Sequence, residues 1–298
     1  MKRAALDNLG SALSDLGDVR GSADLYERAL AINRDLGDRR GELASLLGLG
    51  GASVLLGDNK RAVQLYEQSL GVARAIGDRR GEADSLSGLG VSHKILGQSR
   101  DALQCYEQSL TICRQLRDRA GVGHALGNMG NAYRTLGDIH RAIKCHEDAL
   151  ALFRELGDRH SEVQQLGNLG IAHSQMGEHA RSIEFCEQRL AIAREMGDRL
   201  GEAAMLGNIG VAYTELGQIG RALEFYEKSL PLKQRVGDRR GEANTLFNMS
   251  RALVGLERLE PAIRRCESAL IIFDEIGDPN AVIARETLAA LRQATKSN

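Results

Sequence analysis

The chain has 298 residues, with 39 Lys and Arg against 40 Asp and Glu, which gives a formal net charge of -1 at pH 7. Charges of both signs alternate along the sequence, so we expect neither nucleic acid nor an anionic membrane as the main partner, because both require a basic stripe. Only three prolines, no tryptophan and few β-branched or aromatic runs favour helix throughout.

The cysteines and the distribution of apolar residues indicate the compartment. The cysteines are odd in number and show no CxxC spacing, which predicts free thiols in a reducing compartment. They are Cys105, Cys113, Cys145, Cys186 and Cys266. No apolar run approaches the roughly 20 residues that cross a bilayer, and the N-terminus lacks a signal-peptide core. We therefore expect a cytoplasmic protein.

One period of forty residues fits the whole chain without insertion or deletion. Leucine recurs in register at Leu6, Leu46, Leu86, Leu126, Leu166, Leu206 and Leu246. Glycine recurs at Gly10, Gly50, Gly90, Gly130, Gly170 and Gly210. Such self-similarity predicts a repeat array. The predicted repeats are residues 1–40, 41–80, 81–120, 121–160, 161–200, 201–240 and 241–279, followed by a C-terminal capping helix and tail at 280–298.

Each repeat contains two places where one helix stops and the next starts, and most of them are Gly-Asp pairs such as Gly57-Asp58 and Gly77-Asp78. Glycine can adopt the left-handed conformation that ends a helix, and aspartate can accept the free N–H groups that open the next one. Between these pairs the apolar residues recur every three or four positions, which is the helical period. We expect helix A near 39–56 and helix B near 59–76, repeated every forty residues and stacked to bury their apolar faces.

Three irregularities follow in chain order. Met1 falls directly in the first helix A, so the chain is either a fragment or is covered there by another chain, and the register permits self-association through this end. Pro231 lies inside a predicted helix B and should bend or unwind it. Residues 280–294 predict an amphipathic cap whose apolar positions are Val282, Ile283, Leu288 and Leu291.

The fourth repeat carries a family resemblance. Its large, glycine, aromatic and small positions are filled by Leu126, Gly130, Tyr133, Ala142 and Ala149, which resembles the tetratricopeptide repeat (TPR). Leucine replaces the usual tryptophan, and a longer helix B replaces the usual closing proline. This forty-residue form is similar to repeats of Pins/LGN cell-polarity scaffolds, and also resembles sensor regions of bacterial signalling NTPases and kinesin light chains. The resemblance implies an all-α fold, a right-handed α-solenoid superhelix of seven TPR-like helical hairpins plus a C-terminal capping helix.

The resemblance also implies that helix A lines the concave surface, so its polar residues outside the apolar stripe become candidate peptide contacts. Asparagine offers both a donor and an acceptor to an extended main chain, although it can also bond locally or face water. The recurring asparagines are Asn8, Asn128, Asn168, Asn208 and Asn248. Further candidates are Lys94, His124, Asn131, Arg134, Gln164, Glu215, Asn244 and Arg251. Gly48 and Gly88 replace asparagine in two early repeats, which predicts a weaker polar grip there.

Other recurring residues have structural explanations. The glutamates equivalent to Glu27, with arginines equivalent to Arg34, predict solvated or inter-repeat ion pairs. The Cys145-His146 pair and Cys186 stand where other repeats carry aromatic packing residues, so we predict no metal site and no cofactor. No phosphate-binding loop, HExxH or GxSxG motif is present, which argues against an enzyme.

The sequence therefore predicts a non-catalytic protein–protein interaction scaffold that binds an extended or helical peptide segment of a protein partner in the concave groove. The alternative is a sensor or oligomerisation module that regulates an attached signalling NTPase or transcription regulator. Further domains in the full-length gene product would favour the alternative.

Overall fold

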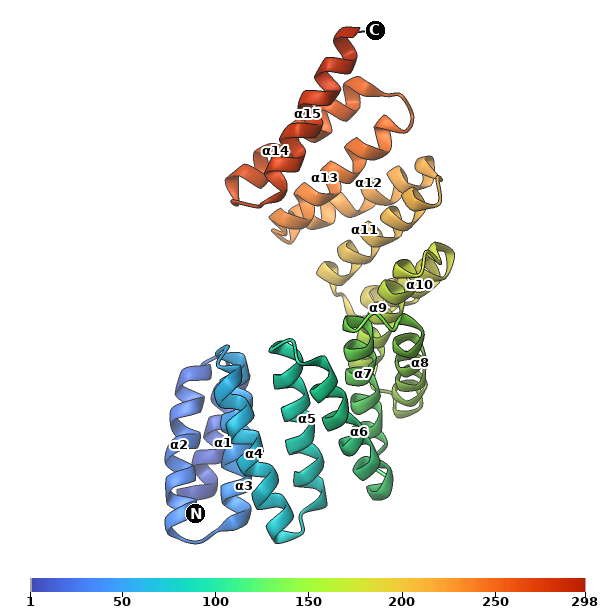
Figure 1. Ribbon diagram of the computed structural model, residues 1–298. Helices are drawn as coiled ribbons and strands as arrows, with labels where there is room; N and C mark the ends of the chain where they lie inside the picture. The colour runs from blue at the N-terminus through green and yellow to red at the C-terminus, as the bar shows by residue number, and fades with distance from the viewer. Residues whose placement is uncertain (1, 298) are drawn as a thin grey trace. The chain divides into compact units, whose positions relative to one another are not determined.

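The computed structural model describes residues 2–297, all of which lie in helices or in the turns that connect them (Figure 1). Side chains are described for residues 6, 9–14 and 16–295. The chain divides into two compact units, Met1–Asp158 and Arg159–Asn298. The first unit contains α1 (Lys2–Asp15), α2 (Val19–Asp35), α3 (Arg39–Leu55), α4 (Asn59–Ile76), α5 (Arg79–Ile95), α6 (Ser99–Leu116), α7 (Arg119–Thr135) and α8 (Ile139–Leu156). The second contains α9 (Arg159–Gln175), α10 (His179–Met196), α11 (Arg199–Glu215), α12 (Ile219–Arg235), α13 (Arg239–Val254), α14 (Leu259–Glu275) and α15 (Asn280–Ser297).

Short Gly-Asp turns join the helices at the predicted places. After α4, Gly77 adopts a left-handed φ of 70°, and the Asp78 carboxylate then accepts the Gly81 N–H at 3.0 Å to open α5. Each turn thus satisfies backbone groups that a helix end leaves unpaired. The predicted helix A near 39–56 and helix B near 59–76 correspond to α3 and α4 within one residue.

Two turns depart from glycine at the left-handed position. Arg117 has a φ of 56° and Glu257 a φ of 58°. A residue with a Cβ has a steric cost in this conformation. The intrinsic backbone preference of Arg117 and Glu257 therefore opposes these two turns, and the surrounding structure must stabilise them.

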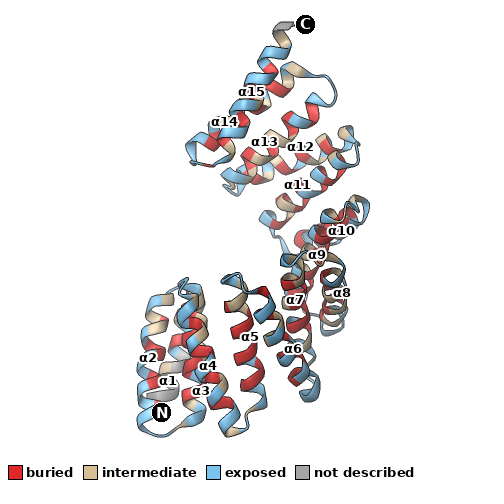
Figure 2. Ribbon diagram, in the orientation of Figure 1, coloured by how far each residue is buried: buried red, intermediate tan, exposed pale blue. Residues whose placement is uncertain are grey.

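Within each unit every helix packs against the next one, and the buried residues face these contacts (Figure 2). Leu46, Tyr106 and Phe153 are fully enclosed in the first unit, as are Ile209 and Tyr226 in the second. Burying a large apolar side chain contributes about 1.5–3 kcal/mol, so the stacking of hairpins is the main source of stability. The predicted all-α solenoid of helical hairpins with an additional C-terminal helix is confirmed. The exact boundaries of the forty-residue repeats stay a prediction.

Two expectations about individual helices are wrong. Helix α12 runs from Ile219 to Arg235 as one helix, so Pro231 does not unwind it, while a bend at Pro231 stays a prediction. Leu230 and Leu232, on either side of the proline, pack against the core of the unit. In α15, Val282 and Ile283 are exposed, because Ala281, Ala284, Leu288 and Leu291 form the buried face instead.

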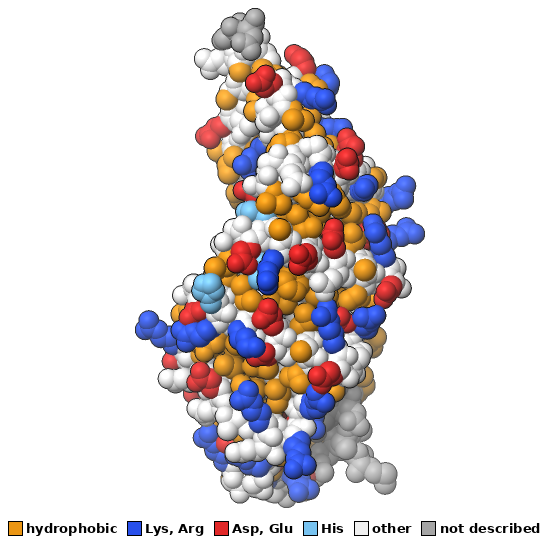
Figure 3. Space-filling view, turned by 90° about the vertical axis from the view of Figure 1, so that its right-hand side faces the viewer, with side chains coloured by type: hydrophobic (Ala, Val, Ile, Leu, Met, Phe, Trp, Pro, Cys, Tyr) orange, Lys and Arg blue, Asp and Glu red, His pale blue; other side chains and the backbone are white. Residues whose placement is uncertain are grey.

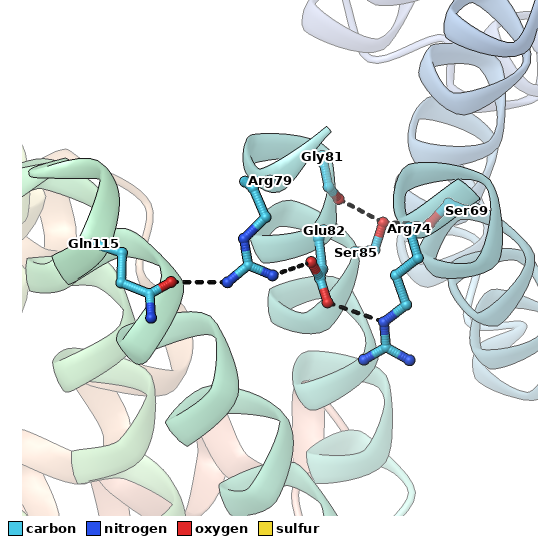
Figure 4. Close-up of polar contacts among 7 residues, drawn as sticks. All are labelled: Ser69, Arg74, Arg79, Gly81, Glu82, Ser85 and Gln115. Carbon is cyan, nitrogen blue, oxygen red and sulfur yellow. Dashed lines mark hydrogen bonds and ion pairs between the residues drawn. The ribbon is translucent and has the colours of Figure 1, made fainter. Parts of the chain in front are cut away.

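In the first unit, an ion-pair cluster joins α4 of one hairpin to α5 of the next (Figure 4). The Glu82 carboxylate, at the start of α5, accepts from Nε of Arg74 at the end of α4 at 2.9 Å and from Nη1 of Arg79 at 2.5 Å. The other end of Arg79 donates to Gln115 of α6 at 2.8 Å. Glu42, held by Arg34 and Arg39, repeats the arrangement between α2 and α3.

The predicted inter-repeat ion pairs are therefore present, with partners that differ from those on the same helix. Arg34 pairs with Glu42 on the following helix, whereas Glu27 pairs with Arg61 of α4. Burial alone would raise the pKa of Glu42 and Glu82, but the hydrogen bonds from two arginines each outweigh it and hold both pKa values below the ordinary 4.5. The carboxylates therefore stay ionised at neutral pH.

Candidate binding surfaces on the odd-numbered helices

In the first unit, the odd-numbered helices line a cavity of about 570 Å³. Its walls come from α1, α3 and α5, and the rings of Tyr26 and Tyr66 reach it from the even-numbered helices. The lining is mostly apolar or small and comprises Ser14, Tyr26, Leu47, Gly48, Gly51, Ala52, Val54, Leu55, Tyr66, Asp84, Ser87, Gly88 and Val91. A chain segment could approach the glycine backbone closely here.

Close packing against tyrosine explains two glycines of this surface. The Tyr66 ring lies between α3 and α5, where a Cβ at Gly50 would be 2.8 Å from its Cε1. A Cβ at Gly88 would be 2.7 Å from its Cδ1 and nearer still to other ring atoms. Since real contacts of this kind are about 3.5–4.0 Å, only glycine fits at either side of the ring.

The candidates of the first unit lie on α5 and α7. His124 is exposed, and its ring centroid lies 5.1 Å from that of Phe153. Asn128, Asn131 and Arg134 are half-buried along the same helix, and Lys94 is half-buried on α5. The structure thus gathers four of the five on one helix, outside the cavity lined by Tyr66.

The candidates of the second unit do not form one continuous row at a single cavity. Gln164 is exposed and lies 2.8 Å from His160, while Asn168 and Asn244 are half-buried. Asn248 and Arg251 line a small cavity of about 30 Å³ with Glu215 and Tyr226. Asn208 lines a separate, larger cavity. The side chain of Asn8 lies outside the described residues. The role of all these residues in binding stays a prediction.

The cavity that Asn208 lines has a volume of about 210 Å³ and lies between α9 and α11, over α10. It is lined by Gly167, Gly170, Ile171, Ser174, Gln175, Ser182, Cys186, Arg189, Met205, Asn208 and Val211. Sequence reasoning missed Arg189. The signal was present in the sequence, because every other repeat has alanine or serine at the equivalent position, as at Ala149 and Ser229.

The histidines and cysteines behave as packing residues. His173 stacks on Phe185 with centroids 5.2 Å apart, just as Tyr213 stacks on Phe225 at 5.4 Å, so His173 takes the place of a tyrosine. All five cysteines are free, and burial raises the pKa of Cys186 to about 11. This thiol is therefore protonated at neutral pH and is a weak nucleophile.

Among residues 2–297, no three His, Cys, Asp or Glu side chains gather in a way that could hold a metal ion. None of the described helices has the length and apolar character required to span a bilayer. Charges of both signs are interspersed with hydrophobic side chains on the face seen in Figure 3, without a continuous patch of either sign.

Comparison with known proteins places the fold. A signal transduction ATPase with numerous domains (STAND) from Pyrococcus horikoshii, described as having a tetratricopeptide repeat sensor, matches with a TM-score of 0.81 and 17% identity. The match covers 98% of this chain and 44% of that protein, so this chain spans less than half of its length. BtubC (BKLC) from P. vanneervenii matches with a TM-score of 0.65 and 19% identity, over 74% of this chain and 92% of that one.

A tetratricopeptide repeat protein from Parabacteroides merdae matches with a TM-score of 0.60 and 17% identity, over 97% of this chain and 98% of that one. No curated protein matches the sequence. The family model described as tetratricopeptide repeat matches residues 2–75, 44–115, 121–195 and 201–275, which is most of the chain. The chain therefore belongs to the tetratricopeptide repeat family, whose repeats serve as protein–protein interaction scaffolds.

Proposed function

We propose that the protein is a non-catalytic scaffold that holds an extended or helical segment of a partner protein against its odd-numbered helices. The candidate contacts are the polar residues of α7 in the first unit and of α9, α11 and α13 in the second. Recognition would combine hydrogen bonds from asparagine and arginine with apolar contact to the cavity floors. Cytoplasmic location is part of the proposal and is supported by five free cysteines.

The observation that carries this proposal is the cavity of about 570 Å³ over Tyr26 and Tyr66. Its volume falls in the range of sites that enclose several side chains or a small ligand. Its apolar lining and half-buried glycines suit a polypeptide, because backbone can approach backbone without a side chain in between.

The test is selection of binding peptides from a phage-displayed library panned on the full chain. Gly51→Leu places an apolar side chain in the cavity, and its Cβ has room, since a Cβ at Gly51 would lie 3.7 Å from the Tyr66 hydroxyl and meet nothing closer. Gly71→Leu is the matched control, since a Cβ at Gly71 on α4 has no neighbour within 4 Å. The proposal expects peptides that bind the wild type and the Gly71→Leu variant but bind the Gly51→Leu variant at least about tenfold more weakly.

Failure to select any peptide would refute the scaffold proposal as stated. Equal binding by both glycine variants would move the contact away from this cavity.

A second candidate is a sensor that regulates an attached signalling NTPase or transcription regulator. It is favoured by the match to the STAND protein, whose repeats are described as a sensor. The test is to purify the full-length gene product and measure its nucleotide hydrolysis. A hydrolysis rate that changes on peptide binding would support this candidate over a free-standing scaffold.

Self-association through the first hairpin also stays a proposal. Sedimentation across a concentration series would reveal it as a mass that rises with concentration. A monomer at every concentration would exclude it.

A further inference from the structure

We infer that the cavity of the α9–α11 surface binds the carboxylate of an Asp or Glu side chain in the partner segment, with Arg189 as the recognising group. This inference rests on the proposed function and names one chemical feature that the partner must carry. Two departures from the repeat pattern, both on α10, create the site.

The first departure empties a space that other hairpins fill. At the position of Cys186, four other even-numbered helices carry a tyrosine packed on a glycine, as Tyr226 packs on Gly210, where a Cβ would be 2.6 Å from the ring. In the α9–α10 hairpin the glycine remains, as Gly170, but its neighbour is the much smaller Cys186 thiol at 3.3 Å from the Cβ position. In the last hairpin a cysteine also occurs, at Cys266, but serine replaces the glycine there.

The resulting volume of about 210 Å³ is large enough for a side chain. A buried cavity of about 150 Å³ accepts benzene, and a water occupies about 30 Å³, so a glutamate side chain with a few waters fits.

The second departure supplies a cation. The equivalents of Arg189 are small and at most 3% exposed. They are Ala29, Ser69, Ser109, Ala149, Ser229 and Ala269. Arg189 instead extends across to α9, where a Cβ at Gly167 would overlap its Nη1 and lie 3.3 Å from its Cζ. Gly167 therefore makes room for the guanidinium at the edge of the cavity.

The guanidinium of Arg189 has no ion-pair partner among the described residues. Its Nε is buried and makes no hydrogen bond within the described part of the chain. None of the eleven residues that line the cavity is acidic. This contrasts with Arg194 on the same helix, which pairs with Glu202 at 2.7 Å. Arg189 as a whole is half-buried, but its buried Nε–H donor lacks an acceptor, which is costly, and a ligand anion at this place would supply one.

A carboxylate fits this site better than a phosphate. Arginine binds a carboxylate through two parallel N–H donors, and one arginine balances its single charge, whereas a phosphate dianion would remain under-neutralised. The apolar wall of Ile171, Met205 and Val211 suits the methylenes of a glutamate, and Asn208 and Gln175 can donate further hydrogen bonds to its oxygens. The cavity opens on the same odd-helix surface on which the partner segment is proposed to lie.

The first experiment tests the cavity directly, without a partner. The Nε–H of Arg189 is followed by NMR in the full chain while N-acetyl-glutamate N-methylamide is added, with the glutamine isostere and inorganic phosphate as controls. We expect a saturable shift with the glutamate compound alone. No shift, an equal shift with the glutamine compound, or a larger shift with phosphate would overturn the inference.

The second experiment uses a peptide library fused to phage at the peptide C-terminus, so that every carboxylate comes from a side chain. Wild type is compared with Arg189→Ser and Cys186→Tyr, which restore the residues that other hairpins carry and should fold. Peptides selected on wild type should hold an Asp or Glu whose change to Asn or Gln weakens binding about 10- to 100-fold. Arg189→Ser should cause the same loss, with no further loss when both changes are combined.

The outcomes separate this inference from the proposed function. Selected peptides without an acidic position, or with one that Arg189→Ser still binds equally well, would overturn the carboxylate site and leave the scaffold intact. If wild type selects no peptide, the scaffold proposal fails, and the NMR titration alone decides whether the cavity binds a carboxylate.

Discussion

Replacement of Gly88 by alanine tests whether tyrosine packing fixes the odd-helix surface of the first unit. Alanine is better than glycine inside a helix by about 1 kcal/mol, so a Gly→Ala change should stabilise any helix that has room for the methyl group. Gly71 has such room, since its Cβ would meet nothing within 4 Å, whereas a Cβ at Gly88 would be 2.7 Å from Cδ1 of Tyr66.

The two variants should therefore move in different directions. Gly71→Ala should gain about 1 kcal/mol. Gly88→Ala gains the same amount from the backbone but must displace the Tyr66 ring, which is only 8% exposed and packed among Ala62 and Leu89. Overpacking of this kind costs about 1–3 kcal/mol, so the Gly88→Ala variant should be less stable than the Gly71→Ala variant by that amount.

Urea unfolding gives the overall difference, and amide hydrogen exchange in α3 to α5 locates it, because repeat arrays do not always unfold in one step. A second test removes the clash. In a Tyr66→Cys background, which copies the Cys186 and Gly170 pair, Gly88→Ala should become stabilising. Equal stability of the two alanine variants, or no change of sign in the Tyr66→Cys background, would refute the packing argument.

Four further outcomes are expected. Since the folded-state pKa of Glu42 and Glu82 lies below 4.5, their contribution to stability is complete above that pH and is lost as the pH falls through the lowered pKa; Glu82→Gln should flatten this part of a plot of unfolding free energy against pH. Arg117→Gly relieves a left-handed φ of 56° and should raise the unfolding free energy by about 1 kcal/mol in urea titrations, while Arg114→Gly, in the preceding helical turn, should lower it. Burial lowers the pKa of Lys233, so its charge opposes folding below that pKa; Lys233→Met should raise the thermal midpoint near pH 7, and the gap should close as the pH approaches 10.5. Asn128→Ala combined with Asn168→Ala should weaken binding of a selected peptide at unchanged thermal stability, and unchanged affinity would remove both residues from the site.

The sequence predicts the helices well because their ends depend on local chemistry. A glycine in the left-handed region and an aspartate that accepts an N–H three residues later act within one turn, as Gly77 and Asp78 show. The positions of the large buried residues follow from the helical period. These features need no knowledge of how one hairpin meets the next.

Features that depend on contacts between hairpins were harder to predict. Arg34 could reach either Glu27 on its own helix or Glu42 on the following one, and only the packing of α2 against α3 decides in favour of Glu42. In α15, apolar residues occur on two faces, and contact with α14 buries Leu288 and leaves Val282 exposed. The cavity beside Arg189 depends on three residues from two helices, so no single position in the sequence predicts it.

The two changes on α10 alter side-chain volume in opposite directions. Cys186 is smaller than the tyrosines at its position in other hairpins, and Arg189 is larger than its alanine and serine equivalents. If Arg189 merely filled the space left by the absent tyrosine ring, the pair would be a volume exchange and no cavity would remain. A space of about 210 Å³ does remain, and the guanidinium lies at its edge. The first change costs folding free energy through lost apolar burial, and the second leaves the buried Nε–H of Arg189 without an acceptor. A ligand that fills the cavity and pairs with Arg189 recovers both terms, so binding and the stability of the second unit must be linked, and the thermal midpoint of that unit should rise with the concentration of a glutamate-containing peptide.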